Sequence, residues 1–284
     1  MDQDITRTQE IRLIHQQYGT FYRIISGVGL VLLGVMIGVG LFSGDAPLLR
    51  DAYITNLYTE GISVLLTIVV LNYLAERRDT SRRELETKEQ LLRDAASTVN
   101  ATARSAVDQT RKRDWHTGES ALLRHIDLRE ANLENTDLRG FDLSGTDFRR
   151  ANLSYARMRY TQLKDCDFRR AWMHAVNLIE MDLRDTQLRL AKLDEARLGS
   201  ADISGVELSN TSLQKARLNN CKMRGTLLFE ADLSGADLRA ADLTDADLRR
   251  TRMDDVICDE KTILPDGNAW SADTDWTLFG ALVG

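Results

Sequence analysis

An apolar residue recurs at every fifth position through the second half of the chain, from Leu123 to Cys258. The residue two places earlier is usually small, the residue between is often Asp or Asn, and two mostly polar residues follow. A period of five fits neither a helix nor a simple strand. In three extended residues the first and third side chains point to one side, so the small and bulky residues face inward and the other two turn a corner. No single unit can bury its own apolar pair, and the pattern therefore predicts a stack of units, a solenoid.

Residues 231–250, ADLSGADLRAADLTDADLRR, show this unit most regularly. They resemble pentapeptide-repeat proteins, and the resemblance covers about half of the chain. It implies a right-handed quadrilateral β-helix in which four quintets make one square coil. We assign residues 119–260 to this domain; their 28 quintets give about seven coils (28/4), a rod roughly 34 Å long at stacking distances of about 4.8 Å.

Both ends of such a solenoid need a cover, because a terminal coil exposes an apolar end. Trp115 precedes the first quintet. After the last one, residues 262–267 (TILPDG) break the period, and Trp270, Trp276 and Phe279 follow. We expect residues 261–284 to form a C-terminal cap. The TILPDG segment also resembles the ends of other pentapeptide-repeat proteins.

Two apolar runs precede the repeat. Residues 24–42 carry no charge over nineteen positions, enough for a helix to cross about 28 Å of hydrocarbon, and we expect a transmembrane helix over 21–43. The second run, 62–75, reaches membrane length only as 57–75. The expected layout is an N-terminal α-helical transmembrane hairpin, a membrane-anchored type known among pentapeptide-repeat proteins. An N-terminal segment, 1–20, precedes it and a short extracytoplasmic loop, 44–56, joins its helices.

The basic residues orient this hairpin. Three arginines precede the first run, and four arginines and a lysine lie in residues 77–88, whereas the connection between the runs holds only Arg50. Positive residues favour the cytoplasmic side. The expectation is a multi-pass protein of the bacterial inner (plasma) membrane, with both termini and the repeat domain in the cytoplasm.

Four residues of the hairpin have two interpretations each. Gly27, Gly34 and Gly38 lie near one face of the first run, a packing surface either for the second helix of the same chain or for a second copy; homo-oligomerisation stays open. Glu60 is either a headgroup-level residue near a helix N-terminus or an intramembrane acid with an ion or proton role. No second acid, His or Lys lies nearby to extend such a pathway.

Residues 76–118 predict a cytoplasmic helical connector. From Glu76 to Arg113 there is no Pro or Gly, and Glu, Lys, Arg, Leu and Ala predominate. Residues 97–100 (STVN) compete for backbone hydrogen bonds and cap helices. We therefore expect a break near 94–100, with one helix before it and a shorter one after it.

Candidate chemistry is sparse. The four histidines are scattered without metal-ligand spacing, and the glycines of the repeat occur singly at corners. Cys166, Cys221 and Cys258 take inward positions and are interpreted as core residues of a reducing compartment. We predict no catalytic residue, no cofactor and no metal, and the repeated Asp residues are interpreted as part of the outer face.

The twenty-residue register stacks arginines at one corner. Each Asp and Arg could neutralise one another on a solvated face; alternatively, the stacked guanidinium groups could bind a phosphate, a lipid headgroup or an acidic partner. Outward apolar residues on the same side favour an interaction surface. The candidate surface comprises Arg149, Arg150, Arg169, Arg170, Arg189, Leu190, Leu227 and Phe229.

Charge argues against DNA as a partner. Residues 119–260 contain 26 acidic and 22 basic residues, a net charge of −4. That balance is too weak for a DNA mimic of the kind found among soluble pentapeptide-repeat proteins, and its sign disfavours direct DNA binding. The leading hypothesis is a non-catalytic membrane-anchored scaffold that docks an unidentified protein partner through its cytosolic β-helix. The alternative is a membrane effector or channel-like oligomer, of a stress or phage-defence type, whose rod senses a signal or drives assembly.

Overall fold

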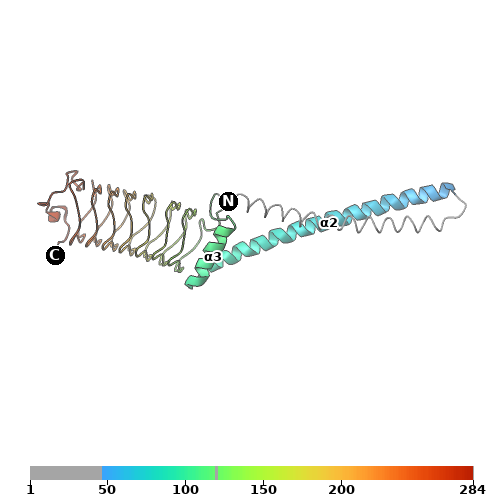
Figure 1. Ribbon diagram of the computed structural model, residues 1–284, viewed down its shortest axis with the longest axis horizontal. Helices are drawn as coiled ribbons and strands as arrows, with labels where there is room; N and C mark the ends of the chain where they lie inside the picture. Colours follow the sequence, from blue (N-terminus) through green and yellow to red (C-terminus); the bar gives the residue numbers. More distant parts are fainter. Residues whose placement is uncertain (1–46, 119–120, 284) are drawn as a thin grey trace, which may run out of the picture. The chain divides into compact units, whose positions relative to one another are not determined.

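The computed structural model describes residues 47–118 and 121–283, with side chains from Glu60 onward (Figure 1). It divides into two compact units, Met1–Leu85 and Glu86–Gly284, which are treated separately. The described helices are α2 (Pro47–Ala95), α3 (Asn100–Lys112) and the 3-10 helix η1 (Trp276–Phe279).

Helix α2 begins earlier than the sequence suggests. Residues 44–56 were expected to form a loop, but α2 already starts at Pro47, because proline favours the first helical position and good helix formers follow it. None of the helices within the described residues is long and apolar enough to cross a membrane. The structure therefore does not support the expected second span over 57–75, and the expected first span, 21–43, lies outside the described residues.

Between residues 62 and 74, α2 exposes apolar side chains on most of its surface, except the side of Leu65 and Val69, which are partly buried. Val64 is 61% and Leu66 65% exposed, and the others of this exposed apolar belt are Ile62, Ile68, Val70, Leu71, Tyr73 and Leu74. A helix that faces water on one side normally separates apolar from polar residues. This exposed apolar belt therefore needs a cover.

The second unit is built on the repeat. Parallel one-residue bridges join the middle residue of most quintets to the residue twenty positions later, from Asp127–Asp147 to Asp237–Ile257. Four quintets therefore make one coil with four faces, which confirms the pentapeptide-repeat β-helix (Figure 1). The bulky inward residues from Leu123 to Met253 are at most 2% exposed, so the repeat supplies a continuous core. The twenty-residue step first changes at Asp242–Ile263, where one extra residue enters the coil.

The corners are turns with a left-handed residue. The last residue of each quintet between His125 and Asp255 has a positive φ, with Asp185 the single exception in that range. The following N–H bonds back to the bulky residue, as in Ala131 N to Leu128 O at 3.1 Å; these are the features of a type II turn. Non-glycine residues take this conformation at a cost of about 1 kcal/mol or more, which the stacked backbone bonds offset.

Helices α2 and α3 cover the first coil. Leu91 and Ala95 of α2, and Ala103, Ala106 and Val107 of α3, are buried in the same core as the quintets. The Asn100 side chain donates to the carbonyls of Asn132 and Glu134 at 3.2 and 2.9 Å, and Arg111 donates to those of Asp137 and Arg139. These bonds pair carbonyls that no preceding coil reaches. The helix break expected near 94–100 lies at 96–99, between the two capping helices.

The last coil is closed by the chain after the repeat. Leu282 bridges to Arg252 as a further rung of the ladder. Trp276 is 7% exposed, and Trp270 and Phe279 pack against the core. The tryptophans of this end therefore pack against the terminal coil.

Candidate functional site

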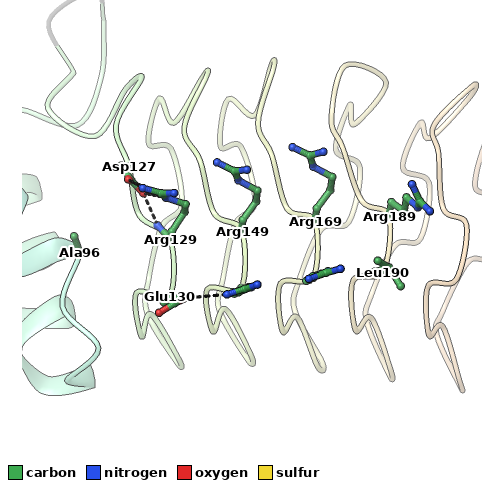
Figure 2. A pocket seen from close by; sticks show the side chains of 10 residues that line it. Ala96, Asp127, Arg129, Glu130, Arg149, Arg169, Arg189 and Leu190 are labelled. Carbon is green, nitrogen blue, oxygen red and sulfur yellow. Dashed lines mark hydrogen bonds and ion pairs between the residues drawn. The ribbon is translucent and has the colours of Figure 1, made fainter.

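A groove of about 790 Å³ runs along the corner that follows the first face of each coil. Its walls are two rows of side chains from consecutive coils, which Figure 2 shows side by side. The first row is Arg129, Arg149, Arg169 and Arg189; the second row is Glu130, Arg150, Arg170 and Leu190. Asp127 and Ala96 complete the lining.

Three arginines of the first row, all except Arg189, are fixed by carboxylates two residues earlier in the chain; Gln187 takes that place before Arg189. Asp147 accepts the backbone N–H of Arg149 and binds its guanidinium through Nε and Nη2, at 2.9 and 2.6 Å. Asp167 holds Arg169 in the same way. The aspartate thus makes an Asx turn at the corner and orients the arginine at once. Along the row, Arg149 also lies 3.5 Å from Asp167 in the next coil.

The second row is less constrained. Arg150 pairs with Glu130 of the preceding coil at 3.2 Å and is 60% exposed. Arg170 follows one coil later, and no ion pair to its side chain is found among the described residues. Leu190 takes the fourth place and is half-buried. The row therefore changes along the axis from an acid, through two arginines, to an apolar residue.

The groove keeps a small positive excess. Six arginines and two acids line it, a balance of 6 − 2 = +4. Asp147, Asp167 and Glu207 lie behind the first row and hold Arg149, Arg169 and Arg189, which leaves 4 − 3 = +1. A guanidinium has five N–H donors, and an aspartate that binds Nε and Nη2 engages only two of them. The groove therefore retains many fixed N–H donors although its net charge is low.

Two of the aspartates at these corners, Asp127 and Asp147, have a pKa below the ordinary value. Hydrogen bonds from Arg129 lower the pKa of Asp127. Burial acts against Asp147, but the hydrogen bonds from Arg149 outweigh it and lower its pKa. At a second corner, Arg139 lowers the pKa of Asp137 to about 2. Aspartates and arginines thus form ion pairs on this solvated surface, as one interpretation of the sequence expected, and the closest of these pairs have the form Asp-x-Arg.

Two aromatic rings stiffen the doubly basic coils from inside. Phe148 and Phe168 directly precede the arginine pairs at 149–150 and 169–170 and are fully buried. Their rings stack with centroids 5.0 Å apart and an interplanar angle of 4°. The backbone that carries Arg149, Arg150, Arg169 and Arg170 therefore rests on a packed pair of rings.

The groove contains most, but not all, of the surface expected from the sequence. Arg149, Arg150, Arg169, Arg170, Arg189 and Leu190 line it. Leu227 and Phe229 do not; Leu227 is 44% exposed, and Arg249 and Arg250 lie over the Phe229 ring at 6.0 and 5.8 Å. The sequence expectation omitted Asp127, Arg129 and Glu130, which the twenty-residue register could have found. Ala96 comes from the connector, and no repeat signal marks it.

The other candidate residues lie elsewhere. The Glu60 side chain is exposed on α2, and Gly27, Gly34 and Gly38 lie outside the described residues. All three cysteines are free. Burial raises the pKa of Cys166 and of Cys258 to about 12 and raises that of Cys221 further. At neutral pH these thiols are therefore protonated and poorly reactive.

Comparisons with known proteins agree with this repeat. The family described as pentapeptide repeats matches in eight copies, over residues 131–170, 161–199, 171–210, 191–228 and 225–257. The β-helix is therefore a pentapeptide-repeat domain. No curated protein matched the chain.

Several solved structures are similar. QnrB1, a plasmid-mediated fluoroquinolone resistance protein, is 20% identical over 57% of this chain and 84% of its own, with a TM-score of 0.30. HetL of Nostoc sp. strain PCC 7120, a pentapeptide-repeat protein involved in heterocyst differentiation regulation, is 22% identical over 58% of this chain and 98% of its own, with a TM-score of 0.20. The pentapeptide-repeat protein alr5209 of Nostoc is 28% identical over 43% and 86%, with a TM-score of 0.19.

Proposed function

We propose that this chain is a non-catalytic docking protein, held at the bacterial inner membrane by its N-terminal segments, whose cytosolic β-helix binds an acidic protein partner. The observation that carries the proposal is the groove with its two rows of arginines on a rigid rod. Rows of guanidinium groups suit recognition of carboxylates, because each one offers a planar fork of donors.

Two features support the membrane part of this proposal. Residues 24–42 carry no charge over nineteen positions. A helix of that length can span the hydrocarbon of a membrane. The exposed apolar belt of α2 presents side chains such as Leu66 and Leu71 that lipid or a neighbouring apolar helix would cover. The arginines that follow it, at 77–78 and 82–83, favour a cytoplasmic location for the β-helix.

The docking function is tested by charge reversal in the full-length chain. R150E/R170E should abolish capture of the partner when the protein is crosslinked in native membranes, purified and analysed by mass spectrometry. Glutamate is tolerated at these left-handed positions, since Glu130, Glu195 and Glu230 occupy equivalent ones. The matched control is R197E/R217E, a reversal of two exposed arginines on a different face of the β-helix, in the coils that follow.

The two variants separate a docking site from a general charge effect. Loss of the same partner protein in both would mean that net charge, not the groove, holds it. Retention of the partner by R150E/R170E would remove the groove from the proposal. Recovery of the wild-type chain alone under gentle conditions would contradict the docking function itself.

A further inference from the structure

We infer that the groove binds one stripe of an acidic α-helix, with carboxylates at i and at i+3 or i+4, and an apolar residue at i+7. This inference rests on the proposed docking function and specifies the partner's chemistry. It follows from the spacing of the arginines, from how they are held, and from the order of residues along the second row.

The spacing favours a helix over an extended chain. Bridges Asp147–Asp167 and Asp167–Gln187 place Arg149, Arg169 and Arg189 one coil apart, at stacking distances of about 4.8 Å. One side of a helix repeats every 3.5 residues on average, or about 5.2 Å at a rise of about 1.5 Å per residue. Same-side residues of an extended strand repeat every 6.6 Å or so. Over the three steps from Arg129 to Arg189, a helix drifts out of register by about 1 Å and a strand by about 5 Å.

The arginines of the first row are prepared for a second carboxylate. Asp147 and Asp167 bind the Nε and Nη2 edges of Arg149 and Arg169, so Nη1 and one Nη2 hydrogen of each remain for a ligand. The side chains are already ordered in this state. Binding therefore loses little of the side-chain entropy that free arginines would lose.

The second row gives the ligand a direction. Glu130 disfavours a carboxylate at the first coil, Arg150 and Arg170 favour one at the second and third, and Leu190 offers an apolar contact at the fourth. Asp127 adds to the acidic character of the first coil. A phosphate polymer or a nucleic-acid strand carries uniform charge and would gain nothing from this order. An acidic helix that ends in an apolar residue matches it.

Two synthetic peptides of identical composition test the inference. In the striped peptide, glutamates occupy i and i+4 and a leucine occupies i+7, all on one side of the helix. In the scrambled peptide, the same residues are distributed over different sides of the helix. Binding to the full-length chain in detergent micelles is followed by fluorescence anisotropy. We expect the striped peptide to bind about tenfold more tightly or better, the gain of one or two charge-assisted hydrogen bonds.

Variants assign the binding to the groove. R150Q/R170Q should weaken the striped peptide about tenfold, while R197Q/R217Q should change its affinity less than about twofold. Equal affinities of the two peptides would overturn the helical stripe. Inorganic polyphosphate, or vesicles containing phosphatidylglycerol, binding at the groove more tightly than the striped peptide would overturn the choice of carboxylates.

These outcomes are distinct from failure of the proposed function. If the groove variant R150E/R170E loses the captured partner while the striped and scrambled peptides bind alike, docking stands and the helical stripe is wrong. If neither the partner nor the peptides depend on Arg150 and Arg170, both proposals are wrong.

Discussion

A threonine in the small inward position of a quintet usually bonds to the coil before it, although Thr186 bonds to Leu183 O within its own turn. The hydroxyl groups of five such residues donate to the carbonyl 23 positions earlier, at 2.7 to 3.2 Å: Thr146, Thr161, Thr211, Thr226 and Thr251. Thr136 belongs to the first coil, and its buried hydroxyl has no hydrogen-bond partner among the described residues. The same residue type therefore stabilises one coil and is a cost in another.

Thr136 and Thr146 make a matched pair for a stability test. Thr146→Val removes the bond to the Leu123 carbonyl and should lower the free energy of unfolding by about 1 kcal/mol or more, because that carbonyl is left unpaired. Thr136→Val removes an unpaired hydroxyl and should be neutral or stabilising. Urea unfolding followed by circular dichroism measures both. Equal losses in the two variants would contradict this account.

The Asp-x-Arg corner gives the domain an acid-sensitive component. The Arg139 hydrogen bond holds the pKa of Asp137 at about 2, below its ordinary value of 3.8. A lowered folded-state pKa means stability that is present above pH 3.8 and lost as the pH falls toward 2. The loss is about 1 kcal/mol, since Arg139 is half exposed and solvent screens the pair.

Asp137→Asn should therefore flatten the acid limb of the stability curve. Wild type should lose more unfolding free energy than D137N between pH 5 and pH 2, and D137N should already be less stable at pH 7. Asp245→Asn is the control, because Asp245 lies at a left-handed corner and its side chain has no hydrogen bond or ion pair to any described residue. Identical pH profiles of wild type and D137N would refute the role of this pair.

At the scale of elements, the β-helix depends on its covers. The first coil has no preceding ladder, so α2 and α3 supply both apolar contacts and hydrogen bonds to its edge. Main-chain contacts add to these, since Asn132 N–H donates to the Ser97 carbonyl and Asp142 N–H to the His116 carbonyl, at 2.9 and 2.8 Å. The connector is therefore part of the folded β-helix unit from Glu86 onward.

Asn100→Ala tests the cover directly. It leaves the carbonyls of Asn132 and Glu134 without the amide donor and should lower the unfolding free energy by about 1 to 3 kcal/mol. Arg104→Ala, an exposed change on the same helix, should stay within about 0.5 kcal/mol of wild type. Hydrogen exchange should show faster exchange at the first coil in N100A only. Uniform exchange in all coils would mean that α3 does not cap the rod.

The repeat could be predicted because a bulky apolar residue must be buried at every fifth position, from Leu123 onward. The groove could be predicted in part, because the twenty-residue register alone stacks Arg149 over Arg169. Three details of the groove and the corners could not be predicted from the sequence. The orientation of the arginines depends on Asx bonds within a quintet, Ala96 arrives from a non-repeating segment, and the Asp185 corner departs from its neighbours although its sequence resembles theirs.

At the scale of the whole chain, the proposed function requires the β-helix and the residues directly before α2, at 44–46, to face opposite sides of a membrane. Impermeant maleimide labelling of single added cysteines tests this. The native thiols give little background, because Cys166 and Cys221 are buried and the pKa of Cys258 is raised to about 12. Trp172→Cys places a thiol on the β-helix at a position that is 60% exposed, and Ala46→Cys places one just before α2.

In intact spheroplasts we expect labelling of A46C and not of W172C, whereas lysed spheroplasts should label both. The expectation follows from the arginines at 77–78 and 82–83, which favour the cytoplasmic side after the exposed apolar belt. Carbonate extraction of the same membranes measures anchoring separately. If W172C is labelled from outside, the orientation is reversed and a cytosolic partner cannot reach the groove. If carbonate releases the chain, the exposed apolar belt of α2 is covered by protein and the membrane anchor is wrong, while the groove tests of Arg150 and Arg170 remain valid on the released protein.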